Sequence, residues 1–380
     1  MGPEVAGRIP PGTRVVVAMS GGVDSSVAAA LLVEQGYEVI GVMLRLWAEP
    51  PLRPDDSGRI TNKCCSLEAV YDARGVAQRL GIPFYVLNAE RPFKAAVVDF
   101  FVEGYAAGQT PNPCLACNRQ IRFGFLLDYA RSLGAEYLAT GHYARVRHGD
   151  PAAGGSTLWR GVDPAKDQSY VLHVLGQAEL AHALFPVGGF SKPQVRGLAA
   201  ERGLPTASRV DSQDLCFLAD GDYRRFLADW APEAVQPGPI LDRAGRELGR
   251  HRGLPYYTVG QRSGLGIAAA QPLYVLDLDT GRNALVVGPV EALRTSELLA
   301  GKIRWIAGAP PANEFDAEVQ IRYHAAAVPA HISVLPDGGA AVRFGEPVRG
   351  ATPGQAAVVY AGPACLGGGL IQRMGECARP

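Results

Sequence analysis

Short apolar runs alternate with amphipathic stretches along the first 230 residues of the chain. The run Val15-Val16-Val17-Ala18-Met19 predicts a buried strand, followed by a Gly/Ser turn and a helix that ends near Gly36. The same pattern predicts further strands at residues 38–46, 84–88 and 136–140, and helices at residues 66–80, 93–107 and 118–133. Ser191 and Gln194 have the spacing of a capping box, which predicts another helix there. Alternating strands and helices indicate an α/β fold with a parallel sheet, whose ligands bind at the carboxyl ends of the strands.

The hydrophobic pattern changes after Trp230. Pro232, Pro237 and Pro239 indicate a linker, beyond which strands are predicted at residues 273–278 and 284–287 around a turn. From about Lys302 onward, period-two alternation at residues 317–323, 331–335, 341–344 and 357–360 predicts a small antiparallel β-barrel. We therefore expect an α/β domain at residues 1–230, a small central domain at residues 231–296 and a C-terminal β-barrel domain at residues 297–380.

Charge and composition indicate the cellular location and the kind of cysteine chemistry but not the partner. The 37 basic and 37 acidic residues balance, so a nucleic-acid partner would have to be held by a local basic surface. No apolar run reaches the roughly 18 residues of a membrane span, and the first residues do not resemble a signal peptide, so we expect a cytoplasmic protein. Seven cysteines, an odd number, favour thiol or metal chemistry over a disulfide scaffold.

A Ser/Gly loop between the first strand and the first helix is the strongest single motif. In Ser20-Gly21-Gly22-Val23-Asp24-Ser25-Ser26 the glycines allow the backbone to approach an anion, and the free N–H groups of a helix start point at it. The loop lacks the lysine of kinase-type phosphate loops. Because Asp24 would repel a phosphate, we expect Mg²⁺ between them. The alternative is a plain capped helix N-terminus.

The cysteines suggest a second site. Cys114 and Cys117 form a C-x-x-C motif that we expect to precede a helix, where the helix N-terminus, Arg119 and Arg122 would favour the Cys117 thiolate. Spacing alone leaves a nucleophile and a structural zinc ligand equally open, although a second ligand pair is not evident. Cys216 lies far away in sequence. The remaining cysteines, Cys64, Cys65, Cys365 and Cys377, are expected to be capping, core or tail residues.

Taken together, these motifs resemble two nested families. The loop is similar to that of the ATP pyrophosphatases (PP-loop proteins), which split ATP between the α and β phosphates. With residues 110–118, 139–143, 166–170, 212–217 and 260–266 in the same order, the chain from about residue 14 to about residue 371 resembles the tRNA-specific 2-thiouridylase family (MnmA/TrmU). The resemblance implies a Rossmann-like ATP pyrophosphatase domain, a central domain and a β-barrel that together use ATP and Mg²⁺ to thiolate uridine 34 of tRNA.

The resemblance also assigns roles to residues. It places the nucleophile on Cys117 and the persulfide carrier on Cys216. It implies that ATP contacts fall on Ala18, Met19, Ser20, Gly21, Gly22, Val23, Asp24, Ser25, Met43 and Gly141. It implies that base and tRNA contacts fall on Asn112, Pro113, Cys114, Lys166, Asp167, Gln168, Arg322 and Tyr323.

One position departs from the family pattern. Many members carry Asp where this chain has Cys114, and a thiol cannot be assumed to inherit the acid or base role of that carboxylate. Three thiolates, from Cys114, Cys117 and Cys216, could instead hold a [4Fe–4S] cluster with one iron open to sulfide. We favour a persulfide route, in which a cysteine desulfurase or a relay protein supplies sulfur and a Cys117–Cys216 disulfide forms.

Two other functions are compatible with part of the sequence. Another adenylating PP-loop enzyme, such as a nitrogen-transferring synthetase, would not need the cysteines. A non-catalytic tRNA-binding protein would not need the intact Ser/Gly/Asp loop.

Overall fold

The computed structural model describes residues 9–50, 66–149, 155–209 and 215–373. Within them, a parallel five-stranded sheet has the order β3-β2-β1-β4-β7, with β1 at its centre. Its strands are β1 (Arg14–Ala18), β2 (Glu38–Arg45), β3 (Phe84–Asn88), β4 (Tyr137–Ala139) and β7 (Ala183–Leu184). Because chain order reverses between β2 and β4 on either side of β1, the carboxyl end of β1 is the point at which such sheets bind ligands.

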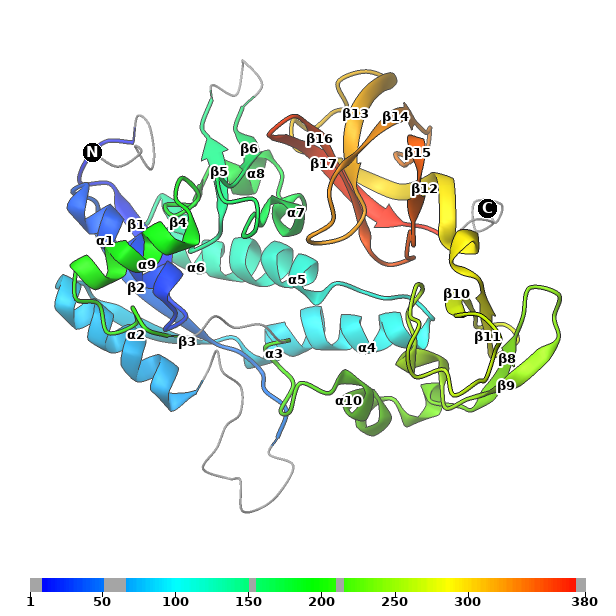
Figure 1. Ribbon diagram of the computed structural model, residues 1–380. Helices are drawn as coiled ribbons and strands as arrows, with labels where there is room; N and C mark the ends of the chain where they lie inside the picture. Colours follow the sequence, from blue (N-terminus) through cyan, green and yellow to red (C-terminus); the bar gives the residue numbers. More distant parts are fainter. Residues whose placement is uncertain (1–8, 51–65, 150–154, 210–214, 374–380) are drawn as a thin grey trace.

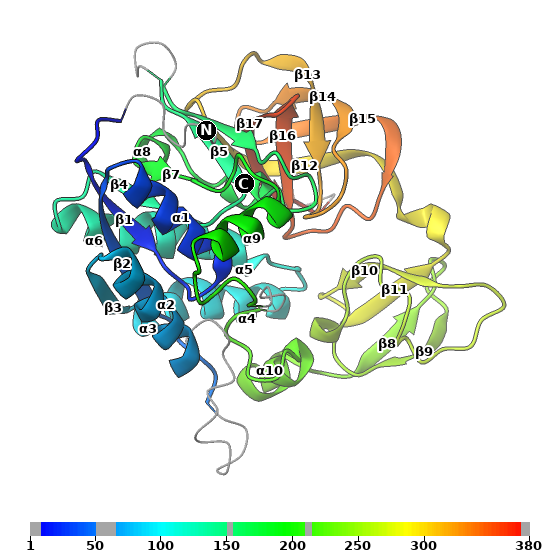
Figure 2. The same cartoon turned by 60° about the vertical axis from the view of Figure 1, so that its left-hand side comes forward.

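Helices cover both faces of this sheet (Figures 1 and 2). The helical elements of this part are α1 (Val23–Glu34), α2 (Leu67–Leu80), α3 (Glu90–Phe93), η2 (Lys94–Val98), α4 (Asp99–Ala106), α5 (Pro113–Ala116), η3 (Cys117–Leu126), α6 (Leu127–Ser132), α7 (Ser169–Leu172), α8 (Gln177–Leu180), α9 (Lys192–Glu201) and α10 (Tyr223–Trp230). Val15 and Val17 of β1 pack with α1, α2 and α9 on one face, while Val16 packs with α6 and α7 on the other. The strand is therefore buried on both faces, as its continuous apolar run predicts.

The C-terminal strands close into a barrel. Six antiparallel strands follow one another in the order β12-β15-β14-β13-β16-β17, and β17 pairs back with β12. They are β12 (Arg294–Trp305), β13 (Glu314–Gln320), β14 (Val328–Val334), β15 (Ala340–Arg349), β16 (Ala356–Ala361) and β17 (Ala364–Ile371). Closure leaves the barrel without the unpaired edges of an open sheet.

A hairpin from the α/β part extends the barrel sheet. β5 (Ala144–Arg147) pairs with β6 (Thr157–Arg160), and β6 pairs with β17 through Leu158 and Trp159. Val358 and Tyr360 of β16 also join the core beneath the parallel sheet. The barrel is thus continuous with the α/β part in both hydrogen bonding and hydrophobic packing.

A separate four-stranded sheet of order β10-β11-β8-β9 lies apart from both, beyond α10 (Figure 1). Its strands are β8 (Gly238–Leu241), β9 (Glu247–His251), β10 (Tyr274–Asp279) and β11 (Ala284–Gly288), flanked by the short helices η5 (Pro232–Ala234), η6 (Leu254–Tyr256) and η7 (Val290–Leu293).

Most of the predicted elements are confirmed, with three corrections. The helix predicted at residues 118–133 begins earlier, at Pro113, because Asn112 caps it and proline suits the first helical position. The strand predicted at residues 317–323 ends at Gln320, so Arg322 and Tyr323 lie in the following turn. The hairpin β5–β6 was not predicted, because its two strands are only four residues long. Within the part of the chain that the structure describes, no helix is long and apolar enough to cross a membrane.

Candidate active site

The Ser/Gly loop lies between β1 and α1, at the carboxyl edge of the sheet. Gly21 adopts a positive φ of 72°, which glycine accommodates without strain. Gly22 is the N-cap of α1 and makes no side-chain cap, while Ser25 and Ser26 donate their hydroxyl hydrogens to its carbonyl oxygen at 3.1 and 2.8 Å. The hydroxyls therefore fix the turn, and the helix N-terminus is directed at the space where an anion would sit.

A lysine from a distant helix completes this loop. Lys192, at the start of α9, places its Nζ 2.8 Å from both carboxylate oxygens of Asp24, and its side chain is only 10% exposed. Tyr143 donates its hydroxyl hydrogen to the same carboxylate at 2.7 Å. Sequence reasoning missed Lys192, which is 168 residues away from Asp24. Asp24 is thus neutralised by a cation of the protein itself.

The predicted ATP-binding side chains fall into two groups. Ser20 is exposed and its Oγ lies 3.3 Å from that of Ser25, so it borders the mouth of the loop. The apolar ones, namely Ala18, Met19, Val23 and Met43, are buried in the cores around the sheet. Contacts of these four residues with a nucleotide would therefore involve backbone atoms near the strand ends.

Gly141, after β4, packs directly against the loop. A Cβ atom at this position would lie 2.7 Å from the backbone nitrogen of Ser25 and 3.0 Å from the Cβ of Asp24. These are main-chain and helix-start atoms that cannot rotate away.

We expect a Gly141→Ala substitution to displace the loop, with a loss of about 1–3 kcal/mol in stability and a clear rise in the KM for the phosphate-bearing ligand. Thermal unfolding and substrate titration would measure the two effects. Gly197→Ala is a matched control, because a Cβ atom there meets nothing within 4 Å. Equal behaviour of the two variants would contradict the close packing.

Cys114 and Cys117 lie on the helix that follows Asn112. The Asn112 side chain accepts the N–H of Cys114 at 3.0 Å, which places Cys114 in the first turn of α5 and Cys117 about one turn further. The prediction that Cys117 marks the helix N-terminus was therefore wrong by one turn. Cys114 is exposed and Cys117 is half-buried, at the point where α5 passes into the π-helical stretch η3. Such π-helical segments occur frequently at functional sites.

Cys216 approaches the same region from a different part of the chain. Cys117 and Cys216 both pack against one apolar cluster, built around Phe93, Phe101 and Phe217. Spacing could not show that the two cysteines pack against the same cluster. Residues 212–214 of the motif around Cys216, together with Cys64, Cys65 and Cys377, lie outside the described residues.

The segment after Cys216 is tightly anchored. Glu49 donates its N–H to the carbonyl of Phe217 and accepts the N–H of Ala219 on its carboxylate. Arg225 binds the same carboxylate through both terminal nitrogens, at 2.7 and 2.6 Å, and this geometry is the bidentate one that guanidinium groups favour. The chain that directly follows Cys216 is therefore held in place by Glu49 and Arg225.

The three cysteines do not form a metal-binding cluster in the described structure. Among residues 9–50, 66–149, 155–209 and 215–373, no three His, Cys, Asp or Glu side chains come close enough to hold a metal ion. The described cysteines are not joined by disulfides either, and Cys365 is buried in the barrel, where desolvation raises its pKa to about 12. Cys365 is thus a core thiol, as its strand position suggests.

Three of the predicted RNA-contacting residues come together from separate parts of the chain. Burial raises the pKa of Tyr323, the nearby Cys114 thiolate raises it further and hydrogen bonding to the Gln168 side chain lowers it, so the three side chains lie near one another. Gln168 in turn accepts the N–H of Tyr143 at 3.0 Å. The cysteine helix, the barrel turn and the residues beside the Ser/Gly loop are therefore contiguous.

The remaining predicted RNA contacts have other neighbours. Asp167 accepts hydrogen bonds from the N–H groups of Gly161 and Ser169 and from Arg160, so its carboxylate shapes its own loop. Arg322 donates to the carbonyl oxygens of Arg349 and Gly350, and its burial lowers its pKa. Pro113 is buried, and Lys166 lies half-exposed on the turn before Asp167.

Two buried histidines give the fold a pH dependence. Burial lowers the pKa of His142 to about 3 and that of His173 to about 4. Both are neutral in the folded state at pH 6.5, while the unfolded chain takes up protons below that value. We therefore expect stability to fall as the pH drops from 6.5 towards 4, by about 1.4 kcal/mol per pH unit for each histidine.

Chemical denaturation at several pH values would measure this slope. Replacing His173 by Gln, which retains a donor for the Tyr170 carbonyl that His173 bonds at 2.7 Å, should reduce the slope by about half. An unchanged slope would show that His173 does not titrate as described.

The sheet topology and the Ser/Gly loop at its switch point define a phosphate-binding α/β protein with an attached β-barrel. Comparison with known proteins agrees. Residues 13–220 match a family described as the tRNA methyl transferase HUP domain, residues 224–289 its PRC-barrel domain and residues 295–371 the aminomethyltransferase beta-barrel domain.

Two relatives are similar over nearly their whole length. The tRNA-specific 2-thiouridylase MnmA of Chloroflexus aggregans is 54% identical over 360 residues, covering 95% of this chain and 98% of that protein. The protein of the same description from Magnetococcus marinus is 53% identical over 358 residues, covering 94% and 98%. A solved 4-thiouridine synthetase–RNA complex with bound ATP has 16% identity, covers 58% of this chain and 51% of that one, and has a TM-score of only 0.32. The chain belongs to the tRNA-specific 2-thiouridylase family.

Proposed function

We propose that the protein catalyses ATP-dependent 2-thiolation of uridine 34, the wobble nucleotide of tRNA. The observation that carries the proposal is the contiguity of the Ser/Gly loop with Gln168, Tyr323 and Cys114. Family membership supports the same activity. The expected cytoplasmic location accords with a tRNA substrate.

The first step activates the uracil. Its C2 oxygen is a poor leaving group, so attack of that oxygen on the α-phosphate of ATP, with release of pyrophosphate, converts it to an AMP ester. The N–H groups at the start of α1 and the exposed Ser20 hydroxyl bind the phosphates, and Lys192 holds Asp24 in place beside them. Lys192 already binds both carboxylate oxygens of Asp24, so the oxygen ligands that Mg²⁺ prefers would come from the phosphates and the loop, and the ion would offset phosphate charge.

The second step transfers sulfur. Cys216 receives a persulfide from a cysteine desulfurase or a relay protein. The Cys117 thiolate attacks the inner sulfur of that persulfide, which forms the Cys117–Cys216 disulfide and releases hydrosulfide. The hydrosulfide displaces AMP from C2, and an external thiol reduces the disulfide. No step of this route requires an iron–sulfur cluster.

The RNA contacts are assigned on the same basis. Cys114 and Gln168 both lie close enough to Tyr323 to shift its pKa, and we assign the target base to the space beside these three side chains. Asn112, Pro113, Lys166, Asp167 and Arg322, which adjoin these residues in sequence, complete the proposed tRNA-binding set.

Mass spectrometry of nucleosides from tRNA incubated with the protein, ATP, Mg²⁺ and a persulfide donor tests the proposal. We expect 2-thiouridine at position 34. Pyrophosphate release without a thiolated nucleoside would instead indicate another adenylating enzyme, and tRNA binding without pyrophosphate release would indicate a non-catalytic protein. Anaerobic purification with iron and sulfide analysis adds a direct check on the cluster: a near-stoichiometric cluster lost in Cys114→Ser would contradict the persulfide route.

A further inference from the structure

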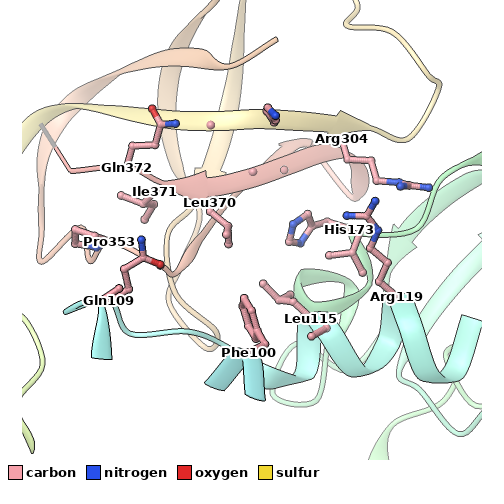
Figure 3. Close-up of a pocket in the computed structure, with 18 of the residues that line it drawn as sticks. Phe100, Gln109, Leu115, Arg119, His173, Arg304, Pro353, Leu370, Ile371 and Gln372 are labelled. Carbon is pink, nitrogen blue, oxygen red and sulfur yellow. The ribbon is translucent and has the colours of Figure 1, made fainter. Parts of the chain in front are cut away.

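A cavity of about 520 Å³ lies between the cysteine helix and the barrel, away from the Ser/Gly loop (Figure 3). Its lower wall is formed by α4, α5 and η3, and its upper wall by β12 and β17. This volume is in the range of sites that hold a small organic ligand. None of the residues proposed above to bind ATP or tRNA lines it.

One end of the cavity is cationic. Arg119 and Arg304 extend into it side by side, next to His173 (Figure 3), and Lys302 also lines it. Glu179 holds Arg304 in place at 3.0 and 3.1 Å, and the Nε of Arg304 is buried without a hydrogen-bond partner in the described structure. The cavity lining contains no Asp or Glu. Glu179 offsets the charge of Arg304, so the net positive charge offered to a phosphate comes from Arg119 and Lys302, while Arg304 adds N–H donors.

The centre and the opposite end differ in character. Phe100 and Leu115 below face Leu370 and Ile371 above, which gives a slot with apolar walls (Figure 3). Beyond the slot, the carboxamides of Gln109 and Gln372 line the far end. Arg373 also lines the cavity, but its guanidinium is engaged by the Leu278 carbonyl at 2.6 Å and by Asp277 at 3.5 Å. Carboxamides both donate and accept hydrogen bonds, as the edge of a nucleobase requires.

The order cation, apolar slot and carboxamide matches the order phosphate, sugar and base face, and base edge in a nucleotide. We propose that this cavity binds one unstacked nucleotide of the RNA substrate, distinct from the target uridine. The inference rests on the proposed function, because that function makes tRNA the substrate. It adds a second contact by which the enzyme recognises its tRNA.

The position of the cavity favours a nucleotide in RNA over a free one. The same helix carries Cys114, which interacts with Tyr323 of the barrel, and Leu115 and Arg119, which line the cavity. The cavity and the space assigned to the target base thus use the same two walls, helix and barrel. An RNA lying along this junction would meet both within a few nucleotides, since the helix between them is about 10 Å across.

Binding of tRNA to the full-length protein without ATP tests the inference, measured by fluorescence anisotropy at several salt concentrations. Arg119→Ala should weaken binding about tenfold and lower the slope of log K against log salt by about one, as expected for one lost phosphate contact. Leu370→Trp should weaken binding by at least tenfold, because the larger ring fills the slot. Leu370 is 39% exposed, so this variant is expected to fold, and thermal unfolding would verify it.

Arg131→Ala is the matched control, because Arg131 is an exposed arginine of the adjoining helix α6 and does not line the cavity. In thiolation assays the effect of Leu370→Trp should fall on the KM for tRNA. Unchanged affinity and salt slope in both variants would overturn the inference. Equilibrium dialysis with uridine monophosphate or adenosine monophosphate gives a second check. Saturable binding of either nucleotide that tRNA does not displace would also overturn the inference. If the wild-type protein makes no 2-thiouridine yet the variants lose tRNA affinity, the proposed function fails and the RNA site stands.

Discussion

A Lys192→Met variant should release pyrophosphate from ATP and tRNA at least about 10²-fold more slowly than the wild-type protein. Lys192 is the cation that neutralises Asp24 beside the proposed phosphate site, and both side chains are largely enclosed. Its removal leaves an uncompensated carboxylate where three phosphates must bind. Breaking such an enclosed pair from one side also costs about 3–5 kcal/mol of stability. Initial rates of pyrophosphate release and a thermal unfolding curve would measure both effects.

The double variant Asp24→Asn, Lys192→Met distinguishes the effect of the lost lysine on ATP chemistry from its effect on stability. It removes both charges, so it should recover much of the stability while staying slow if the lysine also serves the phosphates. Lys94→Met is the control, because Lys94 forms a surface ion pair with Asp99 at 2.7 Å. Wild-type rates in Lys192→Met would show that the contact is dispensable for ATP chemistry.

The variants Cys117→Ser and Cys216→Ser should each lower formation of 2-thiouridine by at least about 10³-fold, because each removes one sulfur of the transfer step. Both cysteines pack against the apolar cluster around Phe93, Phe101 and Phe217, so tRNA-dependent pyrophosphate release, which uses the Ser/Gly loop, should persist. The result expected is therefore a separation of activation from sulfur transfer. Parallel assays of pyrophosphate and of thiolated nucleosides would detect it.

Cys365→Ala provides the matched control, since Cys365 is a buried thiol of the barrel with a raised pKa. It should keep both activities. Simultaneous loss of both activities in Cys117→Ser would instead assign the residue to ATP or tRNA binding. Full thiolation by Cys216→Ser would remove the persulfide carrier from the mechanism.

Local pattern was sufficient to predict the layers of the fold. The apolar run at residues 15–19 is buried on both faces in the parallel sheet, and period-two alternation identified four of the six barrel strands. It was also sufficient for the Ser/Gly loop, because adjacent glycines and hydroxyls at a strand-to-helix turn are a short-range signal.

Long-range proximity could not be predicted from spacing. The pairing of Lys192 with Asp24 depends on how α9 packs on α1, and the interaction of Tyr323 with Cys114 depends on how the barrel sits on the helix. Lys192 directly follows Ser191, the predicted capping residue of a helix. This position at a helix start is the sequence feature that could have indicated Lys192 as a site residue. The start of the cysteine helix was misplaced because the two prolines of residues 110–118 were taken as loop residues.

The pairing of β6 with β17 has a consequence for how the protein is made. β17 is the last described strand, and it bonds both to β12 and, through Ala364 and Cys365, to β6 of the α/β part. A polypeptide interrupted before residue 364 would leave both partners with unsatisfied strand edges, which favour aggregation. During synthesis, therefore, the core beneath the parallel sheet and the upper wall of the cavity are both completed only when β16 and β17 have been made.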